Sequence, residues 1–86
     1  MAAYVHAFES THAAIAAQVA LADAGVRFST IPTPREISAG CGISLLFEAE
    51  GDDQALAHAR SIDDARGLSA LYRKEGRGAY ALVERL

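Results

Sequence analysis

The spacing of the apolar residues changes along this chain, from every second residue to the three-to-four-residue spacing of a helix and back. The order of these changes is the sequence feature that most restricts the possible folds. Alternating apolar residues predict strands, of which Ile43–Glu50 is the clearest, and helical spacing predicts two helices. In chain order, the expected elements are a strand at Tyr4–Glu9, a helix at His12–Ala24, strands at Arg27–Ile31 and Ile43–Glu50, a helix from its N-cap Asp52 to near Gly67, and a strand at Leu68–Arg73. Residues 79–86 fit either a short strand or a helix.

The resulting β-α-β-β-α-β order favours an α+β fold, the ferredoxin-like sandwich, in which two helices cover one face of an antiparallel sheet. The chain has 86 residues, which suffice for one such domain over residues 1–86. The uncovered face of the sheet is expected to carry Tyr and Phe side chains. Such a face offers a surface for a homodimer.

The first helix has clear ends but no clear buried side. Ser10 and Thr11 offer N-cap hydroxyls, and Gly25 is a natural residue to end the helix. Apolar residues surround this helix almost completely, so its periodicity is weak. The best apolar stripe, expected to face the sheet, consists of Ile15, Val19 and Ala22, with Leu21 and Ala14 on its flank.

Charge and hydropathy exclude several classes of function. The net charge is −3 and no basic cluster is present, whereas a nucleic-acid surface needs one. No apolar run approaches the ~18 residues of a membrane-spanning helix, and no signal peptide is recognised. The single cysteine cannot form an internal disulfide, which indicates the reducing cytoplasm. No metal or cofactor is expected, because none of the three histidines has ligand spacing.

The segment from Pro32 to Gly42 is too long and too specialised for a plain hairpin turn, which needs two to five residues. Two glycines flank its cysteine, and glycine permits positive φ or close approach of the backbone. Backbone amides in such a turn can form a concave anion site, and nearby cations favour a thiolate. The candidate site therefore consists of Cys41 as the reacting thiol, with Arg35, Ser38, Gly40 and Gly42 as binding residues.

Simpler interpretations exist for each of these residues. A free cysteine often serves as a small buried hydrophobe, so Cys41 can also be a core residue at the start of a strand. His12 could approach Cys41 and form an activated nucleophile. His6 is expected to be a packed strand residue. Asp52 and its neighbour Asp53 are best explained by capping and solvation, because adjacent helix residues do not face each other.

The segments Phe8–Ala14 and Ile31–Gly42 resemble the selenium/sulfur carrier-like family, which was earlier classed as a domain of unknown function. The resemblance extends from Tyr4 to about Lys74 and includes the whole Pro-x-Pro-Arg-Glu-Ile-Ser-x-Gly-Cys-Gly motif. It implies a non-enzymatic carrier that holds sulfur or selenium on Cys41. The donor would be a protein such as a cysteine desulfurase, and the recipient an acceptor protein.

Three functional hypotheses follow from these observations. A carrier requires an accessible thiolate at Cys41, with the outer atom stabilised by Arg35 and the loop amides. A dimeric regulatory module would instead bind a small anion with the Pro34–Gly42 loop and would not need the thiol. A plain interaction domain would keep Cys41 buried. Reaction of the native protein with a thiol reagent separates the first from the third.

Overall fold

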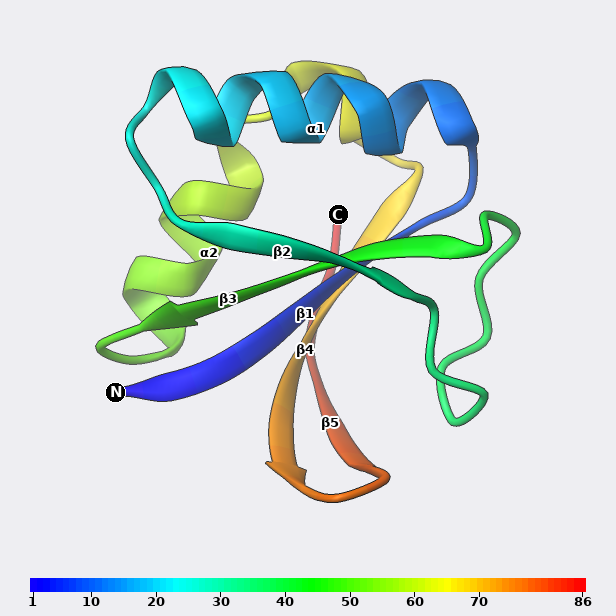
Figure 1. The fold of residues 1–86 in the computed structure, drawn as a ribbon, viewed down its shortest axis with the longest axis vertical. Helices are drawn as coiled ribbons and strands as arrows, with labels where there is room; N and C mark the ends of the chain where they lie inside the picture. Colours follow the sequence, from blue (N-terminus) through cyan, green and yellow to red (C-terminus); the bar gives the residue numbers. More distant parts are fainter.

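A five-stranded antiparallel sheet with helices on one face is formed by residues 1–86 in the computed structural model (Figure 1). The elements are β1 (Ala2–Phe8), α1 (Thr11–Asp23), β2 (Phe28–Pro32), β3 (Ile43–Ala49), α2 (Asp52–Arg60), the 3₁₀ helix η1 (Asp63–Ala65), β4 (Ser69–Gly76) and β5 (Ala79–Arg85). The strand order is β2-β3-β1-β4-β5, and all neighbouring strands are antiparallel. The connection through α1 passes over β3, and the connection through α2 passes over β1. This arrangement confirms the predicted α+β ferredoxin-like class.

The structure adds a fifth strand and shortens the second helix. Residues 79–85, which the sequence left undecided, pair with β4 as β5. α2 ends at Arg60 instead of near Gly67, because Ile62 adopts an extended backbone that places its side chain in the core. The N-cap of α2 is Gly51, so the predicted cap Asp52 is the first helical residue. Its carboxylate is thereby available to side chains outside the helix.

The ends of α1 were predicted correctly, but its buried side was not. Ser10 Oγ accepts the amide of Ala13 at 3.1 Å, and Gly25 ends the helix with φ of +74°. The expected stripe faces solvent: Ile15 is 54% and Val19 57% exposed. The residues that face the sheet are Ala13, Ala14, Ala17 and Leu21. Small side chains let the helix backbone lie close to the sheet, and hydropathy alone cannot identify that preference.

Most of the aromatic side chains lie on the face of the sheet that the helices cover, whereas the sequence predicted them on the uncovered face. Tyr4, Phe8 and Phe47 belong to the clusters under the helices, where bulky rings fill the space left by the alanines. The other face carries Val5, Ala7, Leu46 and Tyr72. It is covered in part by Ile37 of the β2–β3 loop and by Tyr80 of β5. In Figure 1, α1 runs along the top of the view and the β4–β5 turn projects to the bottom.

Candidate functional site

Cys41 lies just before β3, at the end of the sheet where β1 runs into α1 (Figure 1). Its amide donates to the carbonyl oxygen of Phe8 at 2.9 Å, and its own carbonyl accepts from Thr33 Oγ1 at 2.9 Å. The residue is only 5% exposed and packs in the cluster beneath α1 that contains Phe8 and Leu45. Hydrogen bonds at both the amide and the carbonyl of Cys41 hold its backbone in place. The thiol is buried in this conformation, as a plain interaction domain predicts, and is not the accessible thiol that the carrier hypothesis requires.

The sulfur atom of Cys41 meets the first turn of α1. Sγ lies 3.9 Å from Oγ1 of Thr11, the first residue of the helix. Ser10 caps the amide of Ala13, whereas the amides of Thr11 and His12 make no hydrogen bond. Unpaired amides and the helix dipole favour negative charge at a helix N-terminus. The sulfur thus lies beside a helix N-terminus and is packed among apolar side chains.

The structure does not bring the predicted polar companions to the sulfur. Arg35 and Ser38 are exposed and form no hydrogen bond or ion pair. The Gly40 amide donates to Oε1 of Glu9 at 3.3 Å, and the Cys41 amide is used by Phe8. Of the three amides expected to form an anion site, only that of Gly42 is without a hydrogen-bond partner.

The structure explains the presence of glycine at only one of the two positions that flank Cys41. Neither has a positive φ. A Cβ atom on Gly40 would lie 2.7 Å from the carbonyl oxygen of Glu9, so this position requires close approach to the end of β1. A Cβ atom on Gly42 would meet nothing within 4 Å. The conformation therefore explains glycine at position 40 but not at position 42.

Two threonines that contact Cys41 were not recognised from the sequence. Thr33 Oγ1 donates its one proton to the Cys41 carbonyl, so the hydroxyl of buried Ser44, 2.8 Å away, donates to Thr33. Thr33 sits between the two prolines of the motif, which was its only sequence signal. Thr11 was interpreted only as a capping residue, because its contact with Cys41 depends on the fold.

The histidines take no part in the site. The imidazole of His12 is 82% exposed and lies 3.9 Å from Asp64, so it does not pair with Cys41. His6 is fully buried, as the packed-residue interpretation required, and its ring lies tilted against that of Phe8 with the centroids 4.3 Å apart. Neither of its ring nitrogens has a hydrogen-bond partner, and burial lowers its pKa to about 4. No group of three or more His, Cys, Asp or Glu side chains could hold a metal ion.

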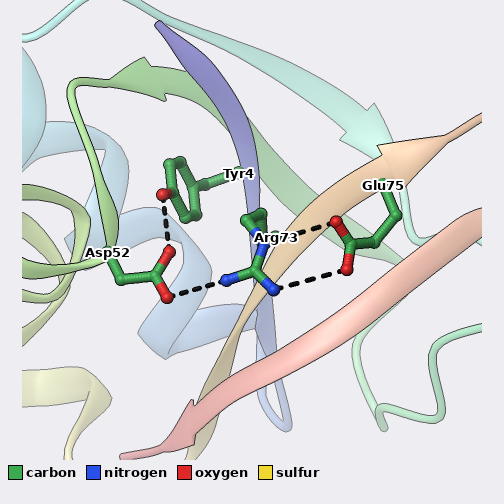
Figure 2. A network of polar contacts seen from close by, with 4 residues as sticks. All are labelled: Tyr4, Asp52, Arg73 and Glu75. Carbon is green, nitrogen blue, oxygen red and sulfur yellow. Dashed lines mark hydrogen bonds and ion pairs between the residues drawn. The ribbon is translucent and has the colours of Figure 1, made fainter.

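A second polar cluster joins three elements near the start of β1 (Figure 2). The hydroxyl of Tyr4 donates to Oδ1 of Asp52 at 2.7 Å, and Arg73 donates to Oδ2 at 2.7 Å. Arg73 also donates to both carboxylate oxygens of Glu75 at 3.3 Å. Hydrogen bonds from Tyr4 and Arg73 lower the pKa of Asp52, while burial and Asp52 raise the pKa of Tyr4. The cluster stands four residues along β1 from Phe8, or about 13 Å, and so is separate from the cysteine.

Fold and site together define a small α+β protein with one thiol beneath a helix N-terminus. The model of the family described as "Putative Se/S carrier protein-like" matches residues 3–64, which include Cys41 and most of the chain. The chain belongs to this family, as the motif resemblance indicated. The match ends before β4 and β5. Neither the search of curated proteins nor that of solved structures found a match. No helix is long and apolar enough to cross a membrane.

Proposed function

We propose that this protein carries sulfur or selenium on Cys41, taking it from a donor protein such as a cysteine desulfurase and passing it to an acceptor protein. Family membership supports the kind of cargo. The observation that carries the choice of atom is the position of Cys41 Sγ, 3.9 Å from Thr11 at the N-terminus of α1. In this proposal the helix N-terminus and the Thr11 hydroxyl are the groups that face a negative charge on the transferred sulfur.

The transfer consists of two exchanges at sulfur. The Cys41 thiolate attacks the outer sulfur of a persulfide on the donor. A sulfur–sulfur bond to Cys41 forms, the sulfur–sulfur bond of the donor breaks, and the electron pair leaves with the donor thiolate. An acceptor thiolate then attacks the outer sulfur on Cys41 and releases the Cys41 thiolate. No oxidant is consumed, and selenium follows the same course.

The loop around Cys41 supplies the remaining groups of the proposal. Arg35 and Ser38 are exposed on the loop, where they can reach the transferred atom or the partner once the two proteins meet. The unpaired amide of Gly42 is a further donor to the outer atom. The chain has no second cysteine to attack the persulfide, so the cargo stays until an acceptor arrives. A reducing cytoplasm would keep the unloaded Cys41 as a free thiol.

Loading with inorganic polysulfide tests this function. The native protein should gain about 32 Da, the mass of one sulfur atom, in intact mass spectra. A reducing thiol should then release the sulfur as sulfide and restore the original mass. The variant Cys41→Ser should gain nothing, which assigns the added atom to Cys41. If Cys41 can be alkylated in the native protein but is never persulfidated, the carrier function is wrong.

The alternative is a dimeric regulatory module that binds an anion with the Pro34–Gly42 loop. Two of the three loop amides already donate hydrogen bonds to Glu9 and Phe8, which leaves only that of Gly42 for an anion in either function. Family membership, and not the loop geometry, supports the carrier over this alternative. Anion affinity that is equal in the native protein and in Cys41→Ser would instead favour the regulatory module.

A further inference from the structure

We propose that residues Ser38–Gly42, here called the strap, close over the sulfur of Cys41 and must swing away from the end of β1 before sulfur can be exchanged. The inference rests on the proposed carrier function and adds a conformational step to it. It assigns opposite roles to the two glycines of the motif. Gly40 allows the strap to close, and Gly42 is the hinge on which it opens.

The closed strap leaves no room for exchange at Cys41. The residue is 5% exposed, and neither of the two surface cavities is lined by any residue of the β2–β3 loop. An attacking thiolate must reach the outer sulfur of a persulfide directly. Packed protein interiors leave few voids larger than a water molecule. Neither the added sulfur nor the attacking group fits unless the chain moves.

The strap is attached to the rest of the protein by four hydrogen bonds and the buried side chain of Cys41. Two of the bonds join it to the end of β1: Cys41 amide to Phe8 carbonyl at 2.9 Å, and Gly40 amide to Glu9 carboxylate at 3.3 Å. The other two come from Thr33, which donates from Oγ1 to the Cys41 carbonyl and from its amide to the Gly42 carbonyl, each at 2.9 Å. The bond to Glu9 lies in solvent. No residue of the strap belongs to a helix or strand. Segments with few buried contacts and exposed hydrogen bonds open locally without global unfolding.

A separate anchor precedes the strap and can stay in place during opening. Ile37 is 4% exposed and packs with Val5 and Ala7 on the face of the sheet opposite α1. Cys41 packs on the α1 face, so the strap passes around the end of β1 between two buried side chains. Opening therefore requires Cys41 to leave its cluster and to give up its backbone hydrogen bonds to Phe8 and Thr33, while Ile37 holds the loop.

Gly42 fits the role of a hinge because the closed conformation does not require glycine there. Its φ is not positive, and a Cβ atom would meet nothing. The extra backbone freedom of glycine is then useful in another conformation, the open one. Gly40 is the reverse case, since a Cβ atom would push against the Glu9 carbonyl and disfavour closure.

The test is the rate of Cys41 alkylation in the native protein as a function of reagent concentration. The rate should level off at high reagent concentration, because opening of the strap then limits it. Gly42→Ala should lower that plateau by on the order of tenfold, because alanine restricts the hinge. Gly40→Ala should raise alkylation at low reagent concentration by a similar factor. Glu9→Ala, which removes one strap hydrogen bond and leaves the backbone unchanged, should act in the same direction if Gly40→Ala does not fold.

Two results would overturn the proposal that the strap must open. One is a plateau in Gly42→Ala equal to that of the native protein. The other is an alkylation rate that rises with urea as steeply as global unfolding, whereas local opening depends on urea only weakly. Polysulfide loading of the same samples separates this proposal from the carrier function. If the alkylation kinetics are as expected for the strap but polysulfide adds no sulfur to Cys41, the carrier function is wrong. If sulfur is added but the alkylation plateau of Gly42→Ala equals that of the native protein, only the strap proposal is wrong.

Discussion

The hydroxyl oxygen of Thr11 lies 3.9 Å from the sulfur of Cys41, although 30 positions separate the two residues in the sequence. The contact exists because the strand order places the start of β3 beside the end of β1, from which α1 begins. It connects the only thiol of the chain to a helix N-terminus. The chemistry of Cys41 should therefore respond to changes in the first turn of α1.

Thr11→Val tests this contact. The variant keeps the branched shape and loses the hydroxyl, so the closed position of Cys41 loses a hydrogen bond worth roughly 1 kcal/mol. Because Cys41 must leave this position to react, alkylation at pH 7 and low reagent concentration should then speed up by about fivefold, which is the same free energy expressed as a rate. Thr11→Ser keeps the hydroxyl and should react at nearly the native rate. Equal rates for the valine and serine variants would show that the hydroxyl does not act on the sulfur.

Thr33→Val should destabilise the β2–β3 loop and expose Cys41 more often. The substitution removes the hydrogen bond to the Cys41 carbonyl and leaves the buried hydroxyl of Ser44 without its partner. Leaving a buried polar group unpaired costs about 1–3 kcal/mol, measurable by urea unfolding. Thr30→Val is the matched control, since Thr30 is exposed on β2, the strand that ends just before Thr33, and makes no side-chain hydrogen bond. Similar losses of stability in the two variants would contradict the assigned role of Thr33.

His6 should make the protein less stable as the pH falls below neutral. Burial lowers the pKa of His6 to about 4 in the native state, against 6.5 for an unperturbed histidine. Between these values the unfolded chain binds a proton that the native protein does not, so the free energy of unfolding falls as pH decreases from about 6.5 to 4. The full loss is roughly 3 kcal/mol.

His6→Leu provides the measurement for this effect. Leucine removes two buried nitrogens that lack partners, so stability at pH 7 should be unchanged or higher. The difference in urea midpoint between pH 7 and pH 5 should be smaller in the variant than in the native protein. The same pH dependence in both proteins would mean that His6 is not the titrating group.

Asp52→Asn should weaken the connection among β1, α2 and β4. The pKa of Asp52 is lowered by the hydrogen bonds from Tyr4 and Arg73, so the native state favours the carboxylate. This contribution to stability is fully present above the unfolded pKa of 3.8 and is lost as pH falls through the lower native value. The variant should unfold at lower urea at pH 7 and show a smaller loss of stability below pH 4.

Asp53→Asn is the control for Asp52→Asn, because the carboxylate of Asp53 is next in the sequence and makes no hydrogen bond or ion pair. It should leave the urea midpoint nearly unchanged. If both variants lose the same stability, the loss comes from removing a negative charge near the start of α2, and not from breaking the hydrogen-bond network in Figure 2.

The fold class could be predicted because strand and helix periodicities alternate cleanly along most of the chain. The packing of α1 could not, because apolar residues surround the helix and only close packing against the sheet decides which ones are buried. Ile15 and Val19 look like core residues by hydropathy, yet alanines occupy the interface. Residues 79–85 were undecided because their strand depends on pairing with β4.

For the site, the motif around Cys41 predicts the loop and a reacting thiol, and that reactivity stays a prediction; the motif does not predict the surroundings of the sulfur atom. Glycine and proline patterns report local backbone requirements, and they do not show which distant element the thiol will meet. In the structure the polar side chains that contact Cys41 are those of Thr11 and Thr33, while Arg35 and Ser38 are exposed on the loop and their role in binding stays a prediction. Those contacts arise from strand order, which a motif does not encode.

The inward position of Cys41 also affects what happens when two protein molecules collide. A disulfide between them requires the sulfur atoms to come within about 2 Å of each other, and a thiol that is 5% exposed cannot do so while the strap is closed. The same shielding limits access of peroxides, which oxidise exposed thiolates to sulfenic acid. Burial of Cys41 therefore slows both its oxidation and its cross-linking to another copy of the protein.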